Sequence, residues 1–205
     1  MKATVTSSIA QSLAQWINGY AGKDELALKK ITYSLEVILL AVSKYIIIYS
    51  LAFFIGVFFQ TLLINFAFGL IKRYSFGLHA RSNIVCIVMC CILFVAVPWG
   101  ITGIGIGVGN YIVLPIFLVI IFALYKYAPA DTKAYPLVGV QRRYKFKKQA
   151  ICSGIILMII ALLVPDEAMK LLLALGAVFQ IVTILPLTYK ILKRSVRNYE
   201  VYECR

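Results

Sequence analysis

The chain has 205 residues, of which 62% are hydrophobic and 14% are charged, and its formal net charge is +13. Soluble domains are roughly half apolar and about a quarter charged, so this composition excludes a soluble globular protein and predicts an integral membrane protein. The length allows about five or six spans of about 20 residues with short connections. We therefore predict one membrane domain over residues 1–205.

The first segment, residues 1–22, is predicted to be an amphipathic helix that lies in the membrane interface. It lacks the charged start, apolar stretch and small-residue cleavage site of a removed secretory signal, so we expect it to stay attached. Gly22 marks a break before the membrane bundle, residues 23–205. The apolar side chains that recur at helical spacing are Ile9, Leu13, Trp16, Ile17 and Tyr20.

Six crossings are predicted from the apolar runs that follow. The run over residues 35–71 is too long for one span. Its return leg, residues 57–71, gives about 22 Å of helix against a hydrocarbon core of about 30 Å, so we expect it to be short, tilted or re-entrant. Four more runs cover 84–99, 111–127, 150–164 and 168–189. The predicted fold is an all-α, polytopic membrane helical bundle of about six transmembrane or partly re-entrant helices, with the N-terminal amphipathic helix beside them.

Basic residues predict the orientation, because cytoplasmic loops of membrane proteins are enriched in Lys and Arg. They gather in 72–81, 142–148 and 190–197, whereas the turn 98–110 has no charged residue and the turn 165–170 has Asp166 and Glu167. We expect the three basic segments and both termini on the cytoplasmic side of the membrane. This orientation and the attraction to anionic lipids account for most of the positive charge, without a nucleic-acid partner.

The only histidine, His79, lies seven positions before Cys86, where an apolar run begins. On one continuous helix the two residues would be about 10.5 Å apart along the axis, whereas a base must come within about 3.2 Å of the proton it takes. Ser82 and Asn83 are favoured N-cap residues, so we predict a helix that starts at 82 or 83 and has Cys86 in its first turn. There the helix dipole and Arg81 favour the thiolate, and His79 can act as its base.

The same residues also have a purely structural interpretation. A lone cysteine in an apolar helix is usually a small hydrophobe, and a lone histidine at an interface is usually a polar anchor. No third residue stands out to orient His79, although Asn83 and Asp131 are candidates. Spacing alone leaves both catalysis and packing open.

Two motifs resemble the accessory gene regulator B family, membrane cysteine peptidases that process the quorum-sensing pro-peptides of Gram-positive bacteria. The first motif combines a basic residue with Gly77, His79, Ala80 and Cys86. The second is the stretch 127–133, Tyr-Ala-Pro-Ala-Asp-Thr-Lys, followed by Pro136 and Leu137. Both stand in the expected order and spacing, and size and span number match over nearly the whole chain.

The resemblance implies that Cys86 is the nucleophile and His79 its partner. Cys86 would attack a peptide carbonyl, release the C-terminal tail of the pro-peptide and keep the remainder as a thioester. A cysteine or serine of the substrate would then close a thiolactone or lactone ring. The family has a functionally important basic residue near Lys72 and Arg73, and Gly77 is expected to serve backbone geometry.

The resemblance also implies a homodimer and a pro-peptide partner that has an amphipathic leader and an acidic C-terminal tail. We expect a basic loop after the second motif to attract that tail, through Arg142, Arg143, Lys145, Lys147 and Lys148. Asp131 is expected to cap the next turn through its side chain rather than to take part in catalysis.

Neither a metal nor a cofactor is expected. Cys90, Cys91, Cys152 and Cys204 do not form a metal-ligand pattern with the one histidine, and the glycines between 100 and 109 do not match a dinucleotide-binding loop. Two other functions are alternatives. A small transporter or peptide exporter would need ionisable residues deep in several spans, and a non-catalytic membrane scaffold would tolerate the loss of Cys86 and His79.

Overall fold

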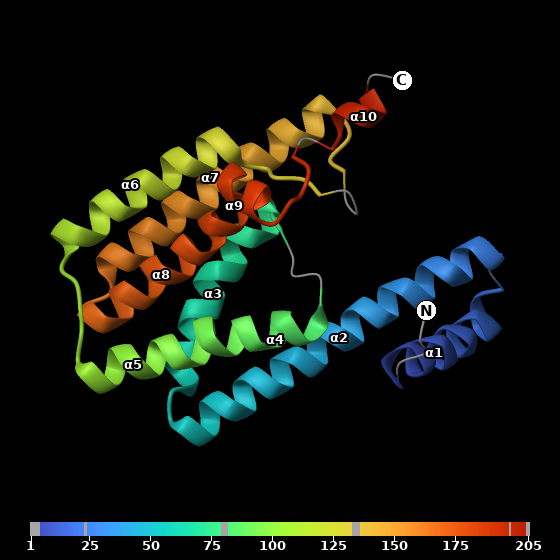
Figure 1. The fold of residues 1–205 in the computed structure, drawn as a ribbon, viewed down its shortest axis with the longest axis horizontal. Helices are drawn as coiled ribbons and strands as arrows, with labels where there is room; N and C mark the ends of the chain where they lie inside the picture. Colours follow the sequence, from blue (N-terminus) through green and yellow to red (C-terminus); the bar gives the residue numbers. More distant parts are fainter. Residues whose placement is uncertain (1–4, 23, 79–81, 133–135, 197, 204–205) are drawn as a thin grey trace. The chain divides into compact units, whose positions relative to one another are not determined.

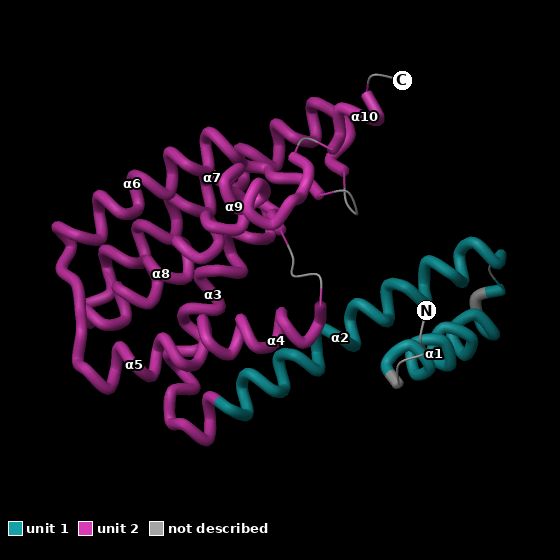
Figure 2. The backbone as a smooth tube through the Cα atoms, in the orientation of Figure 1, with its two compact units in different colours: residues 1–51 teal, residues 52–205 magenta. Residues whose placement is uncertain are grey.

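The computed structural model describes residues 5–22, 24–78, 82–132, 136–196 and 198–203, and within these ranges no strand forms beyond isolated bridges. The predicted all-α fold is confirmed. The chain divides into two compact units, residues 1–51 and 52–205, and the division falls within one helix (Figure 2). In chain order the helices are α1 (Val5–Ala21), α2 (Glu25–Ile55), α3 (Phe58–Ser75), α4 (Asn83–Cys91), the π-helical turn η1 (Ile92–Ala96), α5 (Val97–Ile104), α6 (Asn110–Tyr127), α7 (Val140–Leu163), α8 (Glu167–Ile184), α9 (Pro186–Ile191) and α10 (Glu200–Glu203) (Figure 1).

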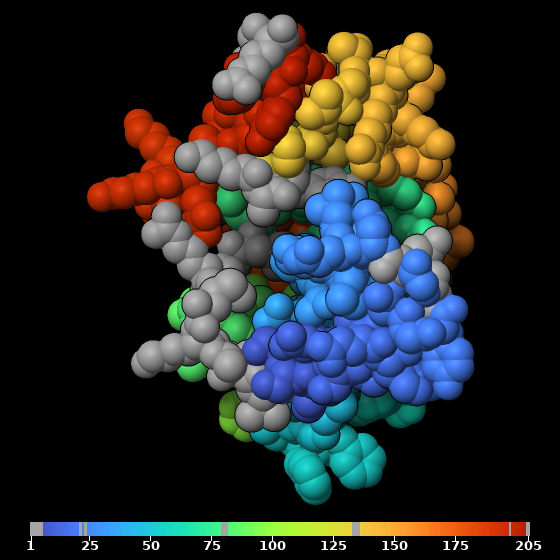
Figure 3. Space-filling view, turned by 90° about the vertical axis from the view of Figure 1, so that its right-hand side faces the viewer, coloured from blue at the N-terminus to red at the C-terminus, as the bar shows by residue number. Residues whose placement is uncertain are grey.

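Unit 1 contains α1 and most of α2. The predicted N-terminal helix is confirmed over Val5–Ala21, and its larger apolar side chains are exposed, with 64% of Trp16 and 82% of Tyr20 accessible. Helix α1 forms part of the surface drawn in dark blue in Figure 3. An exposed apolar stripe beside polar residues is what a helix needs in order to bind a membrane interface. A carboxylate oxygen of Asp24 accepts the backbone N–H of Ala27 at 3.2 Å and so caps the start of α2.

Five helical segments in the described part of the chain are long and apolar enough to cross a membrane: α2, the continuous stretch 83–104, α6, α7 and α8. The sixth predicted crossing corresponds to α3, a helix of 18 residues that starts after the turn at Gly56. Lys72 and Arg73 lie in its last turn. Such a helix is about 27 Å long, slightly less than the hydrocarbon core. The helix is longer than the predicted leg, residues 57–71, and its tilted or re-entrant course in the membrane stays a prediction.

The core of unit 2 forms around α3, which packs closely on α8. A Cβ atom added to Gly176 would lie 2.5 Å from the carbonyl oxygen of Ile64 and 2.8 Å from the Cβ of Ala67. Small residues let the two backbones approach, as is usual for helices in membranes. Helices α6 and α7 complete this core with buried residues such as Phe117 and Leu157.

Helix α7 begins earlier than predicted. The sequence predicts a basic loop before a span that starts near 150, but α7 begins at Val140 and includes Arg142 to Lys148. The loop prediction is wrong for these residues because Lys and Arg are good helix formers. A carboxylate also supports the helix start, since Oε1 of Glu203 accepts the backbone N–H of Gly139 at 2.8 Å. Negative charge at a helix N-terminus is stabilising.

Candidate active site

Cys86 lies in the first turn of α4, as predicted. Ser82 is the N-cap residue, with φ −105° and ψ 138°, and its carbonyl oxygen accepts the backbone N–H of Cys86 at 3.0 Å. The side chain of Ser82 makes no capping hydrogen bond. Cys86 is half-buried and its thiol is free. His79 and Arg81 lie outside the described residues, so the predicted pairing of His79 with Cys86 stays a prediction.

The chain approaches this region through Ser75, Phe76, Gly77 and Leu78, which we call the 75–78 turn. Its backbone is held from two sides. The N–H of Ala130 donates to the carbonyl of Ser75 at 2.9 Å, and the N–H of Gly77 donates to the carbonyl of Ala130 at 3.1 Å. On the other side the N–H of Leu78 donates to the carbonyl of Thr183 at 3.1 Å. The second motif and α8 thus both fix the backbone just before position 79.

Gly77 has a backbone role at this point. Its φ is +108°, which side chains rarely allow, and a Cβ atom would lie 2.6 Å from Oγ1 and 3.1 Å from the carbonyl oxygen of Thr183. Glycine alone combines that conformation with such a close approach. Phe76, which is not a glycine, also has a positive φ of 56°. Strained residues of this kind persist where surrounding contacts hold them.

Gln180 is a polar residue of this region that sequence reasoning missed. It lies on α8, is fully buried, and its Nε2 donates to Oγ of Ser75 at 2.9 Å and to the carbonyl of Phe76 at 2.6 Å. The available signal was an amide side chain inside the apolar run 168–189, since polar groups within spans are costly and usually have a role.

The two candidate basic residues of α3 have different surroundings. Arg73 is exposed, and its guanidinium lies 5.8 Å from the ring centre of Tyr74. Lys72 is half-buried, with Nζ 4.8 Å from the ring centre of Phe68. Both stand one turn or less before the 75–78 turn, on the helix that leads into it. Arg73 is therefore the more accessible of the two cations.

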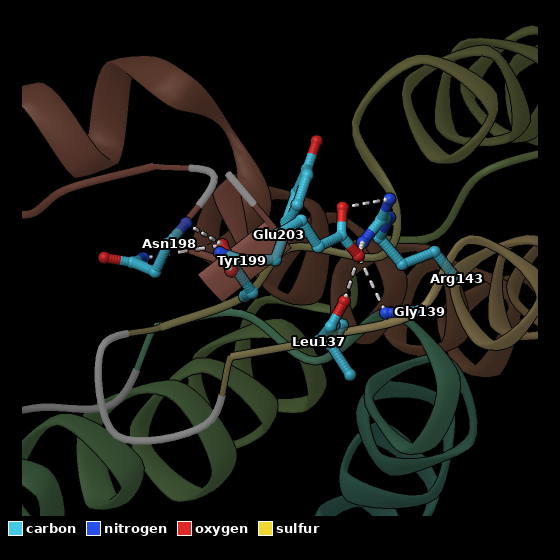
Figure 4. Close-up of polar contacts among 7 residues, drawn as sticks. Leu137, Gly139, Arg143, Asn198, Tyr199 and Glu203 are labelled. Atoms are coloured by element: carbon cyan, nitrogen blue, oxygen red, sulfur yellow. Dashed lines mark hydrogen bonds and ion pairs between the residues drawn. The ribbon is translucent and has the colours of Figure 1, made fainter. Parts of the chain in front are cut away.

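The predicted substrate-binding cations are divided by their contacts. Arg143 is engaged within the chain: its two terminal nitrogens bind the carboxylate of Glu203, the second at 3.0 Å, and its guanidinium stacks 3.9 Å from the ring centre of Tyr199 (Figure 4). The same guanidinium donates to the carbonyl of Leu137 at 3.0 Å. Three other cations of α7 remain exposed: Arg142, Lys145 and Lys148. Lys147 is half-buried, with Nζ 4.4 Å from the ring centre of Tyr125.

Asp131 binds a segment far along the chain, whereas the turn that it is expected to cap includes residues outside the described ranges. Its carboxylate accepts the backbone N–H of Asn198 at 3.1 Å and that of Tyr199 at 2.8 Å. Its own carbonyl accepts the hydroxyl of Tyr189 at 2.9 Å. The side chain is 5% exposed. The carboxylate therefore fixes the C-terminal segment that carries Tyr199 and Glu203, and the predicted cap of the next turn stays a prediction.

The contacts of this C-terminal segment shift the pKa values of Glu203 and Tyr189. The hydrogen bond from Arg143, followed by that from the Gly139 N–H, holds the pKa of Glu203 below its usual range. Burial, with a smaller contribution from the Asp131 charge, raises the pKa of Tyr189 to about 12. In the described ranges no three His, Cys, Asp or Glu side chains converge as a metal site would require.

Comparisons with known proteins agree with the resemblance. The family model described as Accessory gene regulator B matches residues 7–184. A putative AgrB-like protein of Clostridium acetobutylicum is 36% identical over 202 residues, which is 98% of this chain and 96% of the relative. A putative AgrB-like protein of Listeria innocua is 42% identical over 88% of this chain and 87% of its own length. Accessory gene regulator protein B of Staphylococcus lugdunensis is 29% identical over 87% of this chain and 93% of its own length. No solved structure matches.

Proposed function

Because the chain belongs to the accessory gene regulator B family, we propose that it is a membrane-embedded cysteine endopeptidase that cuts a quorum-sensing pro-peptide and cyclises the product. The observation that carries the proposal is the position of Cys86. The thiol lies in the first turn of a membrane-spanning segment, a few residues after a backbone turn that two other elements hold. Such a scaffold suits a nucleophile that must meet its substrate in one geometry.

The proposed reaction has two acyl transfers. In the first, Sγ of Cys86 attacks the carbonyl at the boundary between signal and tail, and His79 takes the thiol proton. The C–N bond breaks, His79 gives the proton to the leaving amine, and the tail departs. A thioester then joins the signal segment to Cys86.

In the second transfer a cysteine or serine side chain of the bound segment attacks the thioester. The new thioester or ester bond closes the ring as the bond to Cys86 breaks, and the proton of the attacking thiol or hydroxyl passes to the departing Cys86 sulfur. Thiol attack exchanges one thioester for another, so the activated acyl group is retained. Limited access of water at a membrane boundary protects the acyl-enzyme from hydrolysis.

The exposed cations of α7 support a role for the acidic tail of the substrate. Arg142, Lys145 and Lys148 are exposed and can attract a carboxylate-rich peptide, whereas Arg143 is occupied by Glu203. We expect the amphipathic leader to lie on the lipid surface. Following the positive-inside rule, we propose a cytoplasmic location for Cys86, these cations and both termini, and we expect a homodimer.

The test is tail release by the purified full chain in liposomes, with a synthetic pro-peptide that has an amphipathic leader and an acidic C-terminal tail as substrate. We expect release by the wild type and by Cys90→Ala, the matched control one helical turn further along α4, and none by Cys86→Ala or His79→Ala. Equal release by Cys86→Ala would overturn the assigned nucleophile. Pro-peptide that crosses the bilayer uncut would instead support the exporter, and a signalling function that survives both substitutions would support the scaffold.

A further inference from the structure

The buried amide of Gln180 connects α8 to the backbone that leads into position 79. Its two hydrogen bonds, to Oγ of Ser75 and to the carbonyl of Phe76, join residues more than 100 positions apart in the chain. The hydroxyl of Ser75 itself donates to the carbonyl of Ile71 at 2.9 Å, so towards Gln180 it accepts. Both partners therefore require a donor, and this fixes which end of the amide faces the turn.

The 75–78 turn has the features of a backbone that needs external support. Phe76 has φ 56° and ψ −127°, and Gly77 follows with φ 108°. Two consecutive residues with positive φ persist only where the surroundings determine them. Ala130 and Thr183 supply backbone contacts to the residues on either side of the Phe76 carbonyl, and Gln180 supplies the side-chain donor to that carbonyl.

The free-energy cost of burying the polar side chain of Gln180 also indicates a role for this residue. Gln180 lies in a membrane-spanning helix and is fully buried, where an apolar side chain of the same size would pack without polar groups to satisfy. Among the described residues its Oε1 has no hydrogen-bond partner, so the amide is held by the Nε2 contacts at the expense of a buried acceptor. Polar residues retained inside membrane spans are usually functional.

We propose that Gln180 is a positioning residue for the cysteine endopeptidase site: by fixing the Phe76 carbonyl and the Ser75 hydroxyl it determines where the chain leaves the 75–78 turn, and hence how His79 meets Cys86. This inference rests on the proposed function. The residue takes no part in proton transfer or bond making. Its effect reaches Cys86 only through the segment that carries His79.

The test compares Gln180→Met with wild type in liposomes. Methionine keeps the length and removes both donors, so we expect single-turnover tail release to slow about 10- to 100-fold while KM changes less than about twofold, since misplacement of a reacting group acts on the chemical step. The matched control is Thr61→Val. Thr61 is also buried on α3, its Oγ1 also has no partner in the described ranges, and it lies far from the turn along that helix. Thr61→Val should react like wild type.

A second readout separates positioning from general damage. The rate at which iodoacetamide alkylates Cys86, followed by peptide mass, should fall on Gln180→Met in the wild-type background and stay unchanged in the His79→Ala background. Equal slowing in both backgrounds, or no slowing in either, would overturn the inference. If Gln180→Met fails to insert as a helical protein, Gln180→Asn carries the same comparison, because its amide is one methylene too short to keep both contacts.

The two proposals fail differently. A wild-type protein that releases no tail contradicts the endopeptidase function itself. A wild-type protein that releases the tail, beside a Gln180→Met variant of equal rate, contradicts the positioning role alone.

Discussion

Unit 2 contains two polar clusters that differ in charge and in burial. Around Gln180 the groups are neutral and buried: one amide, one hydroxyl and the backbone of the 75–78 turn. Around Glu203 the groups are charged and partly accessible, since the side chains of Arg143 and Glu203 are 18% and 29% exposed. Both clusters bind segments distant in sequence, but through different physical forces.

The difference follows from the surroundings of each cluster. An ion pair in surroundings as buried as those of Ser75 and Gln180 would have to overcome a large desolvation cost, whereas neutral hydrogen bonds hold the 75–78 turn at a smaller one. Near the surface, water and salt screen charges, so an ion pair has a small desolvation cost but stabilises only weakly. The turn should therefore respond to shape and hydrogen-bond donors, whereas the C-terminal segment should respond to salt and pH.

The largest effect is expected for Gly77→Ala. The new Cβ would need a positive φ and would lie 2.6 Å from Oγ1 of Thr183, and we expect a loss of about 2–4 kcal/mol in stability with loss of tail release. The control is Gly69→Ala in the middle of α3, where nothing lies within 4 Å of an added Cβ. Thermal unfolding in detergent measures the stability of both variants, and the liposome assay measures their tail release. Wild-type behaviour of Gly77→Ala would refute a rigid turn.

Removal of the Asp131 carboxylate should release the C-terminal segment. In Asp131→Ala the N–H groups of Asn198 and Tyr199 lose their acceptor, at about 1–3 kcal/mol, so hydrogen exchange over residues 198–203 should accelerate about 5- to 100-fold. The matched variant is Asp166→Ala, which removes a carboxylate that caps only its own helix through Met169. Unchanged protection of residues 198–203 from exchange in Asp131→Ala would show that the hydrogen bonds to Asp131 do not stabilise this segment.

Neutralisation of the exposed α7 cations should weaken substrate binding moderately. For the triple variant Arg142→Gln, Lys145→Gln and Lys148→Gln we expect KM for the pro-peptide to rise about 3- to 10-fold and to depend less on salt, with kcat retained. A matched triple variant removes three cations near the C-terminus: Lys190→Gln, Lys193→Gln and Arg194→Gln. The same change in both triples would point to the net charge of the protein rather than to the face of α7.

The smallest effect is the pH dependence of the Glu203 contact. Because the folded pKa of Glu203 is lowered, the contact stabilises fully above the unfolded pKa of about 4.3 and is lost as pH falls through the folded value. The test is the ratio of the hydrogen-exchange rate of residues 200–203 in Glu203→Gln to that in the wild type. This ratio should be above one at pH 7 and approach one as the pH falls. A ratio that is independent of pH would contradict the ion pair.

The membrane character and the start of α4 could be predicted because they depend on local signals. Hydropathy identified the apolar runs, and the Ser82 and Asn83 pair placed Cys86 in a first helical turn. The prediction of a basic loop over residues 142–148 was wrong because the sequence shows no helix start there. The carboxylate that supports the start of α7 belongs to Glu203, some 60 positions later. Helix propensity and that distant carboxylate outweighed the local pattern.

The contacts that organise the candidate site could not be read from the sequence. The carboxylate of Asp131 binds backbone N–H groups that lie 67 and 68 positions later, and no local pattern indicates these partners. Gln180 was counted as part of the apolar run 168–189. Its role could not be predicted because it depends on how α8 packs against α3 and on the backbone conformation of Phe76. Such contacts depend on the tertiary fold rather than on spacing along the chain.

The most direct test of the account is to trap the acyl-enzyme. The wild-type protein in liposomes is given a pro-peptide whose ring-closing nucleophile is replaced by alanine, and the protein is examined by intact mass and peptide mapping. We expect an adduct on Cys86 with the mass of the substrate less its tail, which hydroxylamine removes and which Cys90→Ala retains. Tail release without any adduct, or an adduct on another residue, would contradict Cys86 as the nucleophile.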